Sequence, residues 1–471
     1  MQVHLIGICG TAMATLAALL KRRGHDVRGS DSHVYPPMSD FLAAEGIPIL
    51  DGYDESHIRD GLDLVVVGNA ISRGNPELEA VLDRKVRFTS LPEAIRDHFL
   101  WDARSIVLAG THGKTTTTSL TGWLLAAGGA DPTVLVGGIA RNFGETGSSY
   151  RIGRPGGPFV IEGDEYDSAF FDKTAKFLKY LPDIAVIGNL EFDHADIYAD
   201  LEALRVAFRR LVNLVPRGGL TVLGADSPEA AALAAGARSR VVTFGTAPGA
   251  DWQAVDVQPA GPPGSSAAAS TAFHVRRGGE DLGRFVVPLV GAHNVRNALA
   301  ALIVGTECGV AIEALRDGLA GFLGVKRRLE VVGERHGVRV YDDFAHHPTA
   351  VAETLAAVRA AEPGRRLWAI FEPRSASSCR RVFQADFARA FRAADEVIVA
   401  SVFRSTLPEA ERLSEATLVA DLVAAGTPAR HLPDVDAIVS AVASEARDGD
   451  LVVIMSNGGF GGIHRRLVEA L

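Results

Sequence analysis

The stretch SIVLAGTHGKTTTTSLTGWLLAAGG, residues 105–129, decides which kind of fold this sequence encodes. Its apolar start is typical of a buried strand, and the segment from Lys114 onward predicts a helix. The turn between them, GTHGK, places two glycines and a lysine where nucleotide-binding proteins hold phosphates. The match to GxxxxGK[ST] is incomplete, because its first glycine would fall at Leu108. We interpret the turn as a phosphate-binding loop, the alternative being a tight turn before a threonine-rich helix start.

Each residue type in this turn suits a phosphate site. Glycines let backbone N–H groups approach phosphate oxygens, a lysine reaches the terminal phosphates, and a threonine hydroxyl can bind Mg²⁺. Four consecutive threonines are poor helix formers, which favours a functional reason for them. The residues expected to bind nucleotide here are Gly110, Thr111, His112, Gly113, Lys114, Thr115 and Thr116.

Strand-like and helix-like segments alternate on both sides of this stretch. VHLIGI at 3–8, a helical pattern over 11–23 and DVRGSD at 26–31 begin a βαβ series, which predicts a parallel sheet. A third series begins near residue 338. At about 150 residues per domain, 471 residues predict three tandem α/β domains. We expect a Rossmann-like N-terminal domain, a central P-loop ATPase domain and a Rossmann-like C-terminal domain, over residues 1–100, 101–325 and 326–471 respectively.

The composition indicates a globular protein and excludes several functional classes. Lys and Arg total 48 against 57 Asp and Glu, a net charge of −9, so we expect no nucleic-acid or membrane partner. The three cysteines are far apart, which argues against a disulfide framework and favours the cytoplasm. The Pro- and Gly-rich segment 258–271 predicts a surface loop.

Acidic residues follow two apolar strands of the central domain. Carboxylate oxygens are ligands that Mg²⁺ prefers, and an imidazole follows the second strand. The alternative for any one acid is a solvated loop side chain. The acids and the imidazole are Glu162, Asp164, Glu165 and Asp167 in IEGDEYDS, and Glu191, Asp193, His194 and Asp196 in NLEFDHAD.

A second glycine-rich turn, GICGTAM, follows the first strand. Gly7 and Gly10 allow a pyrophosphate at a helix start, and Asp31 after the second strand could reach a sugar or base. The turn is not GxGxxG, since Cys9 stands where the second glycine would be. In isolation it favours dinucleotide binding, with a purely structural turn as the alternative.

Five further motifs contain residues that suit ligand binding. Asn294 and Asn297 in GAHNVRN could contact a ligand, and the alternative is that they cap a helix. Arg328 in VKRR could bind a phosphate, and the alternative is that it lies in a solvated basic loop. Paired acids and imidazoles occur in YDDFAHHP, and Arg374 in FEPRS suits a carboxylate-bearing ligand, as does the loop MSNGG.

Over nearly the whole chain, the order of these motifs resembles the Mur ligases, the ATP-dependent amide-forming enzymes of peptidoglycan assembly. The strings that match are GTHGKTTTT, IEGDEYDS, NLEFDHAD, GAHNVRN, VKRR and DDFAHHP. FDKTAKFLKY, FEPRS and SNGG resemble the recycling branch, although Ala376 stands where that branch more often has Asn. Arg209 occupies the place of a carbamoylated lysine in other branches, which also favours a muramate-accepting enzyme.

The resemblance implies a function in peptidoglycan recycling. It implies an ATP- and Mg²⁺-dependent ligase that joins the lactyl carboxylate of UDP-N-acetylmuramate to the amine of L-alanyl-γ-D-glutamyl-meso-diaminopimelate through an acyl phosphate. The alternative within the family is the UDP-N-acetylmuramate–L-alanine ligase. We expect no obligate protein partner.

The resemblance also implies roles for single residues. The catalytic set would be Lys114, Glu162, His194 and Arg328, with the metal bound by Thr115, Glu162 and His194. Beyond the loop at 110–116, ATP would contact Asn294, Asn297, Arg328 and Asp343. The substrates would contact Gly7, Gly10, Thr11, Met13, Asp31, Arg374, Ser375 and Asn457.

Three other functions remain as alternatives. A nicotinamide-dependent oxidoreductase would rest on residues 3–31 alone and leaves the loop at 110–116 unexplained. A P-loop switch or scaffold would hydrolyse ATP without an amine acceptor. A folate polyglutamate ligase shares the ATPase plan but not the N-terminal domain.

Overall fold

The structure is a computed structural model that describes residues 1–32, 34–35, 38–260, 270–403 and 407–471. The chain forms two compact units. The first comprises Met1–Leu190, Glu202–Trp252 and Leu299–Gly318, and the second comprises Glu191–Leu201, Gln253–Ala298 and Leu319–Leu471. The three expected α/β sheets are present, which confirms the fold class.

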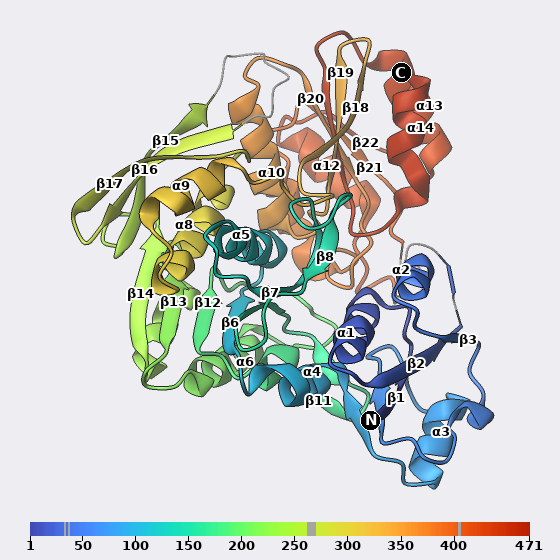
Figure 1. The fold of residues 1–471 in the computed structure, drawn as a ribbon. Helices are drawn as coiled ribbons and strands as arrows, with labels where there is room; N and C mark the ends of the chain where they lie inside the picture. Colours follow the sequence, from blue (N-terminus) through green and yellow to red (C-terminus); the bar gives the residue numbers. More distant parts are fainter. Residues whose placement is uncertain (33, 36–37, 261–269, 404–406) are drawn as a thin grey trace. The chain divides into compact units, whose positions relative to one another are not determined.

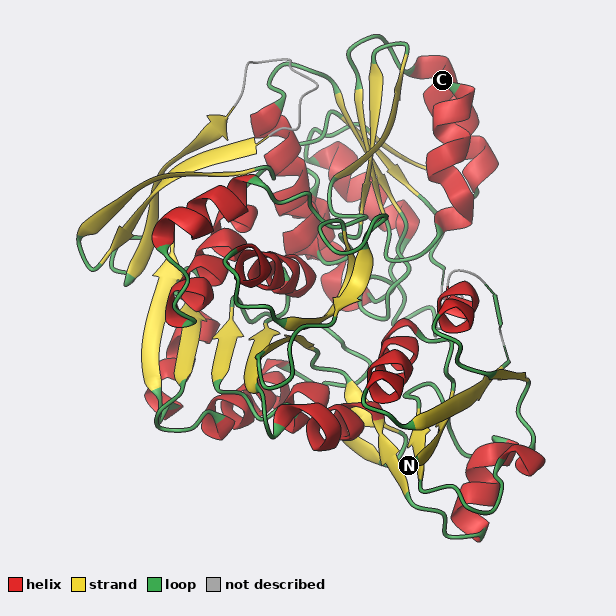
Figure 2. Ribbon diagram, viewed as in Figure 1, coloured by secondary structure: helices red, strands yellow, loops and turns green. Residues whose placement is uncertain are grey.

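The N-terminal sheet is parallel throughout, in the order β3-β2-β1-β4-β5. Strands and helices alternate along this part of the chain (Figure 2), as the βαβ pattern predicts. Its strands are β1 Gln2–Ile6, β2 Asp26–Asp31, β3 Ile49–Asp51, β4 Leu64–Val67 and β5 Phe88–Ser90. Its helices are α1 Thr11–Arg22, α2 Met38–Ala44, α3 Pro76–Asp83 and α4 Leu91–Ile95.

The central sheet places the phosphate-binding loop in the middle of its strand order. Within the first unit this order is β14-β13-β12-β6-β9-β7-β8, parallel except for the antiparallel pair β7–β8. The strands are β6 Arg104–Ala109, β7 Thr133–Ala140, β8 Ser148–Arg151, β9 Pro158–Gly163, β12 Ile184–Ile187, β13 Leu220–Gly224 and β14 Arg240–Gly245. The helices are α5 Lys114–Ala127, α6 Leu201–Leu214 and α7 Pro228–Ala231, and β10 Asp167–Ala169 pairs with β11 Asp172–Ala175 in a small hairpin.

Three strands of the second unit were not expected from the sequence: β15 Trp252–Ala260, β16 Ser270–Arg277 and β17 Glu280–Val287. The pair β16–β17 is antiparallel. The loop expected over 258–271 is therefore shorter, since its ends belong to β15 and β16, and its middle, 261–269, lies outside the described residues. Helices α8 Ala292–Glu307 and α9 Ile312–Ala320 follow.

The C-terminal sheet is buried on both faces. Its order is β18-β19-β23-β20-β21-β22, and only β18–β19 is antiparallel. Helices α10–α12 cover one face and α13 and α14 the other (Figure 1), so β20 turns Phe371 to one core and the fully buried Trp368 to the other. The strands are β18 Glu330–Arg335, β19 Val338–Asp343, β20 Leu367–Phe371, β21 Glu396–Val399, β22 Ala429–His431 and β23 Leu451–Met455. The helices are α10 Pro348–Ala361, α11 Gln384–Ala390, α12 Glu415–Ala424, α13 Val435–Glu445 and α14 Ile463–Ala470.

Across the described ranges, no helix combines the length and the apolar composition that crossing a lipid bilayer requires.

Candidate functional site

The loop between β6 and α5 has the backbone that its two glycines permit. Gly110 has φ +131°, and a Cβ there would lie 3.0 Å from the carbonyl oxygen of Asn189. Gly113, with φ +79°, is the residue before the first turn of α5. L-residues with side chains rarely adopt such φ values, so both positions favour glycine. The loop therefore enters the helix in a conformation that exposes first-turn N–H groups, which bind anions in phosphate sites.

Asn189 holds this loop from the segment that directly follows β12. Its Oδ1 accepts a hydrogen bond from the backbone N of His112 at 2.8 Å, and its Nδ2 donates to the carbonyl oxygen of His112 at 3.1 Å. Its own carbonyl oxygen accepts from the backbone N of Thr111 at 3.1 Å. Sequence reasoning gave Asn189 no role, although it opens the NLEFDHAD string.

Lys114 bonds to three acceptors of its own unit. Its Nζ donates to the carbonyl oxygens of Gly110 at 2.8 Å and Thr111 at 3.1 Å, and to Glu165 Oε1 at 2.8 Å. Burial by itself lowers the pKa of the Lys114 amine, but the carboxylates of Glu165, Asp164 and Glu162 together raise it by more, so the amine stays charged. The sequence placed Glu165 among the acids but did not predict this contact.

Thr115 and Glu162 face each other, as a Mg²⁺-nucleotide site requires. Thr115 Oγ1 donates to Glu162 Oε1 at 3.1 Å, and Gly137 N donates to Glu162 Oε2 at 2.7 Å. The register of the parallel strands β6 and β9 pairs Leu108 with Glu162, which brings the carboxylate to the loop. A hydroxyl and a carboxylate are hard oxygen ligands, so the residues present fit Mg²⁺ bound with a phosphate.

The threonine run has two structural members. Thr117 Oγ1 donates to the carbonyl oxygen of Gly113 at 2.9 Å, and Thr118 Oγ1 donates to that of Lys114 at 2.8 Å. Buried hydroxyls in a helix commonly bond to the preceding turn in this way. Thr116 is also buried. Hydrogen bonds within the helix therefore account for Thr117 and Thr118, and the expected roles of Thr115 and Thr116 stay predictions.

The N-terminal turn is built around Asp31. Gly7, with φ +83°, and Ile8 donate their backbone N–H groups to the carbonyl oxygen of Ser30 at 2.9 and 3.0 Å. Asp31 Oδ2 accepts from the backbone N of Cys9 at 2.9 Å. This contact gives Asp31 a structural role in addition to the expected role in ligand binding.

The other predicted residues of this turn differ in their exposure. Gly10 precedes the first turn of α1 and Thr11 begins it, so both lie where a helix start can bind an anion. Met13 is 5% exposed and packs in the core of the N-terminal part. Contact between Met13 and a ligand stays a prediction.

His194 lies in the second unit with a strained backbone. It has φ +55°, and its backbone N donates to Asp193 Oδ1 at 2.7 Å and to Ser377 Oγ at 2.9 Å. Burial raises the pKa of Asp193, but the nearby imidazoles of His194, His346 and His347 lower it by more. Asp193 therefore remains a charged carboxylate beside these imidazoles.

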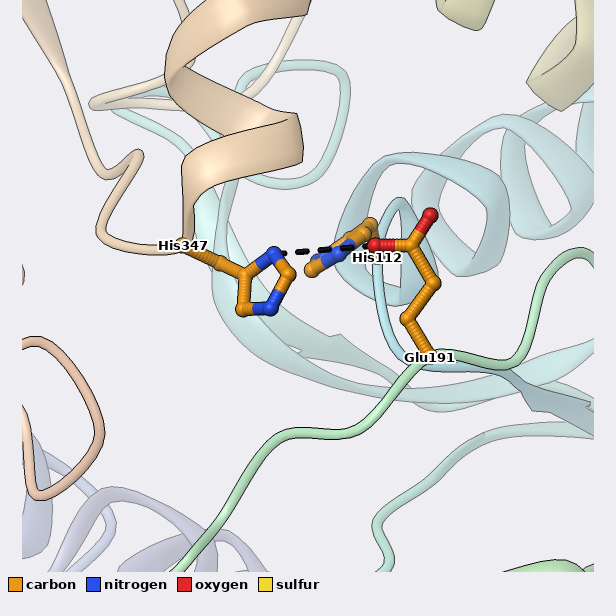
Figure 3. Close-up of side chains that lie close together, drawn as sticks. All are labelled: His112, Glu191 and His347. Atoms are coloured by element: carbon orange, nitrogen blue, oxygen red, sulfur yellow. Dashed lines mark ion pairs between the residues drawn. The ribbon is translucent and has the colours of Figure 1, made fainter. Parts of the chain in front are cut away.

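Glu191 and His347 approach each other in the same unit (Figure 3). His347 Nδ1 lies 3.6 Å from Glu191 Oε2, which accepts from Thr349 Oγ1 at 2.6 Å. His347 Nε2 lies 3.2 Å from the carbonyl oxygen of Phe192. The second histidine of DDFAHHP therefore binds the NLEFDHAD segment, a contact that sequence reasoning did not predict.

Asn294 and Asn297 lie together on the first turns of α8. Asn294 Nδ2 donates to the carbonyl oxygen of Val290 at 2.8 Å, and Asn297 Nδ2 donates to Asn294 Oδ1 at 3.2 Å. Asn294 is 8% exposed. Asn294 therefore has a structural contact at the start of α8, but its amide nitrogen donates to a carbonyl oxygen, which differs from the N-cap contact of the alternative interpretation. Nucleotide contact stays a prediction for both residues.

Arg328 and Asp343 are neighbours at the start of the C-terminal domain. The Arg328 guanidinium lies 4.8 Å from the ring centroid of Phe344. Asp343 accepts from the backbone N of Leu329 at 2.7 Å and from that of Ala345 at 2.8 Å. Burial raises the pKa of Asp343, although Arg328 and these N–H groups oppose the shift.

Arg374 and the SNGG loop fit each other closely. The Arg374 guanidinium lies 3.6 Å from the ring centroid of Phe403 and 3.5 Å from Glu372 Oε1. A Cβ on Gly458 would lie 2.0 Å from Arg374 Nε, so a side chain at this position would displace the arginine. The FEPRS and SNGG strings, predicted separately, therefore form one structural feature.

Ser375 and Asn457 lie beside this feature. Ser375 is 8% exposed and donates through Oγ to Ser378 Oγ at 2.8 Å. Asn457 Oδ1 is buried and accepts no hydrogen bond from the described residues. Ala376 is 5% exposed, so its small side chain belongs to the packed interior. A ligand contact by Asn457 would satisfy a buried acceptor and remains a prediction.

Comparison with known proteins matches all three parts of the chain. The model of the Mur ligase family catalytic domain matches residues 2–100, that of the Mur ligase middle domain matches 108–305, and that of the Mur ligase glutamate ligase domain matches 327–458.

Two curated relatives and one solved structure are similar over nearly their whole length. The chain is 40% identical over 473 residues to the UDP-N-acetylmuramate–L-alanyl-gamma-D-glutamyl-meso-2,6-diaminoheptandioate ligase of Escherichia coli K12, covering 100% of this chain and 98% of that protein. It is 40% identical over 465 residues to the UDP-N-acetylmuramate–L-alanine ligase of Kineococcus radiotolerans, covering 97% and 93%. The crystal structure of a murein peptide ligase from Psychrobacter arcticus 273-4 matches with a TM-score of 0.71 and 36% identity, covering 100% of this chain and 98% of that one.

Proposed function

This chain belongs to the Mur ligase family, and from that premise we propose that it joins UDP-N-acetylmuramate to L-alanyl-γ-D-glutamyl-meso-diaminopimelate, using ATP and Mg²⁺. The reaction would be the amide-forming step of peptidoglycan recycling. The observation that carries the proposal is the fit of Arg374 to Gly458, because it ties together the FEPRS and SNGG strings that resemble the recycling branch. The full-length similarity to the E. coli ligase supports the same acceptor.

The chemistry brings two anions together. The lactyl carboxylate of the UDP-sugar attacks the γ-phosphorus of ATP, ADP leaves, and an acyl phosphate forms. The α-amine of the tripeptide then attacks the acyl carbon, phosphate leaves, and the amine loses a proton. Catalysis of such a transfer depends mostly on positioning and charge compensation.

The first unit provides groups that suit the phosphates. We assign Lys114 to the β- and γ-phosphate oxygens and Thr115 with Glu162 to Mg²⁺, which would neutralise charge on the phosphates. The contact of 3.1 Å between Thr115 and Glu162 supports this pairing. The loop backbone from Gly110 to Thr116 would complete the phosphate contacts.

The second unit provides groups for the rest of the reaction. We assign His194 to the metal or its water, Asn294 and Asn297 to the adenosine, Arg328 to the transferred phosphoryl group and Asp343 to ATP. The shared position of Arg328 and Asp343 at one strand end supports a common role for them. Arg374, Ser375 and Asn457 would bind the peptide. The UDP-sugar would bind to the first unit, at the turn from Gly7 to Met13 with Asp31.

The second candidate is a UDP-N-acetylmuramate–L-alanine ligase. It is favoured by the K. radiotolerans relative, which is as similar in percentage identity as the E. coli one. Both candidates use the same nucleotide and the same UDP-sugar, so only the amine acceptor distinguishes them.

The deciding experiment supplies ATP, Mg²⁺ and UDP-N-acetylmuramate with either the tripeptide or free L-alanine. We expect phosphate release and a product of the mass of the UDP-sugar tripeptide with the first acceptor, and kcat/KM for L-alanine at least about a hundredfold lower. A reaction without any amine measures the ATPase background. Product with L-alanine alone would contradict the recycling assignment and support the second candidate.

A further inference from the structure

The ammonium group of Lys114 already has three bonding partners. An ammonium offers three N–H donors. Two of the acceptors are carbonyl oxygens of the phosphate-binding loop, Gly110 and Thr111, and the third is the Glu165 carboxylate at 2.8 Å. For Lys114 to donate to a phosphate, one of these bonds has to be given up.

Glu165 is the anion among these acceptors, and it is deeply placed. Its side chain is 1% exposed and that of Lys114 is 13% exposed. It follows the end of β9 by two residues, whereas Glu162 lies within β9 and binds Thr115 and Gly137 instead. The two glutamates therefore hold different ends of the site: one contacts the residues expected to bind metal, and the other contacts the lysine expected to bind phosphate.

We propose that Glu165 is the internal counter-ion of the phosphate-binding lysine: it holds Lys114 before nucleotide binds and releases it to the terminal phosphates, so that it sets nucleotide affinity. The inference rests on the proposed function only in that Lys114 binds the β- and γ-phosphates. Glu165 is a positioning residue in this scheme, since it acts through Lys114.

The exchange is physically simple. A carboxylate and a phosphate both form strong charge-assisted hydrogen bonds with an ammonium group, so they compete for the same N–H donor. The two carbonyl bonds keep the ammonium at the loop while the third partner changes. Nucleotide binding therefore has to overcome a protein–protein ion pair, and removing the charge on Glu165 removes this competition.

The test is the equilibrium binding of ATP, ADP and AMP by calorimetry to the wild-type full chain and to Glu165→Gln. Glutamine keeps the size of the side chain and removes its charge. We expect the Kd of ATP and ADP to fall about tenfold, the contribution of one charge-assisted hydrogen bond. The Kd of AMP should stay unchanged, because AMP has no β- or γ-phosphate for Lys114 to bind.

A matched control removes a paired carboxylate elsewhere in the same unit. Glu229 bonds to Arg205 through both of its oxygens, at 2.5 and 2.7 Å, and takes no part in the loop. Glu229→Gln should bind all three nucleotides as the wild type does. Thermal unfolding of each variant checks its folding, and Glu165→Asp, which keeps the charge on a shorter side chain, provides a second variant.

The outcomes separate the inference from the proposed function. Tighter ATP and ADP binding by Glu165→Gln, with Glu165→Asp between it and the wild type, supports the inference, and a structural role alone would not tighten binding. If Glu165→Gln folds and binds ATP and ADP no more tightly than the wild type, the inference is overturned. If Glu165→Gln does not fold, wild-type affinity in Glu165→Asp overturns the inference. A wild-type chain that binds neither ATP nor ADP overturns the proposed function, and the inference with it.

Discussion

At the residue scale, the β9–β10 segment gives each of its buried or partly buried acids a separate partner. Glu162 accepts from Thr115, Asp164 pairs with Lys176 at 2.5 Å, and Glu165 pairs with Lys114 at 2.8 Å. Unpaired buried charges are costly, so one cation cannot be removed without affecting the acid that it faces. Lys114 should therefore contribute to stability as well as to the proposed phosphate binding.

Replacing Lys114 tests both contributions. We expect Lys114→Ala to lower phosphate release in the ligation assay at least about a hundredfold, because the variant lacks the ammonium group that would neutralise the transferred phosphate. Affinity for the UDP-sugar, measured by calorimetry, should stay close to that of the wild type. Phosphate release at the wild-type rate would contradict the assignment of Lys114.

A double variant separates stability from function. Lys114→Ala leaves the Glu165 carboxylate without its cation and should lower the free energy of unfolding by about 3 kcal/mol. Adding Glu165→Gln removes the uncompensated charge, so the double variant should recover part of this loss in urea unfolding. It should not recover phosphate release.

The sequence predicted the chemical roles of single residues better than it predicted which residues they contact. The approach of Thr115 to Glu162 could be expected, because a GK[ST] turn and an acid at a neighbouring strand end have defined places in a parallel sheet. The contacts of Lys114 with Glu165 and of His112 with Asn189 depend on the path of two loops. Loop paths are not encoded in periodicity, and no local pattern distinguished Glu165 from Asp164.

At the element scale, Glu77 ties together four elements of the N-terminal domain. Its side chain is fully buried on α3 and accepts from His4 Nε2 on β1 at 2.9 Å and from Ser30 Oγ on β2 at 2.6 Å. It also lies 2.6 Å from His57 Nδ1, in the short turn before β4. One carboxylate thus links α3 to β1 and β2, the strands that flank the candidate UDP-sugar turn.

Glu77→Gln should destabilise the chain in a pH-dependent way. Burial raises the pKa of Glu77, but the hydrogen bonds from His4, Ser30 and His57 lower it by more, so the net pKa is below its usual value. A lowered carboxyl pKa stabilises the folded state above the usual glutamate pKa, and this stabilisation is lost as the pH falls through the lowered value. We expect the variant to lose about 3 kcal/mol of unfolding free energy at pH 7 and less at pH 4.

Urea unfolding followed by circular dichroism measures this difference. Glu79→Gln is the matched control, because Glu79 lies on the same helix but pairs with the exposed Arg73. The control should change stability far less at either pH. A loss for Glu77→Gln that is equal at pH 7 and pH 4 would contradict the role of its charge.

The sequence predicted most of the helices and strands near the site, but it predicted their first and last residues less accurately. The helix expected over 11–23 runs from Thr11 to Arg22, and the strand-like run at 3–8 is regular only to Ile6. Apolar runs continue beyond the last paired residue, so sequence overestimates strand length. The strand β15 was missed because most positions from Val255 to Gln258 are exposed, which removes the apolar run that marks a buried strand.

At the scale of the whole molecule, the three sheets share one design. In each, residues expected to bind ligand follow the carboxyl ends of parallel strands: the turn after β1, the loop after β6 and the FEPRS string after β20. This is where open α/β sheets bind ligands. The alternation of apolar runs and helices predicted this plan, whereas the antiparallel strands β8 and β18 at sheet edges carry no such signature.

One chain that provides for both a UDP-sugar and ATP should make the acyl phosphate before the amine arrives. With ATP, Mg²⁺, UDP-N-acetylmuramate and hydroxylamine but no peptide, we expect the hydroxamate of the UDP-sugar together with ADP and phosphate. Hydroxylamine is a small nucleophile that attacks the acyl carbon in place of the tripeptide amine, and product mass identifies the adduct. Lys114→Ala and a reaction without the UDP-sugar should both give none. If ligation of the tripeptide proceeds while no hydroxamate forms at any hydroxylamine concentration, the carboxylate is not activated before the amine binds, and the order of steps proposed for this enzyme is wrong.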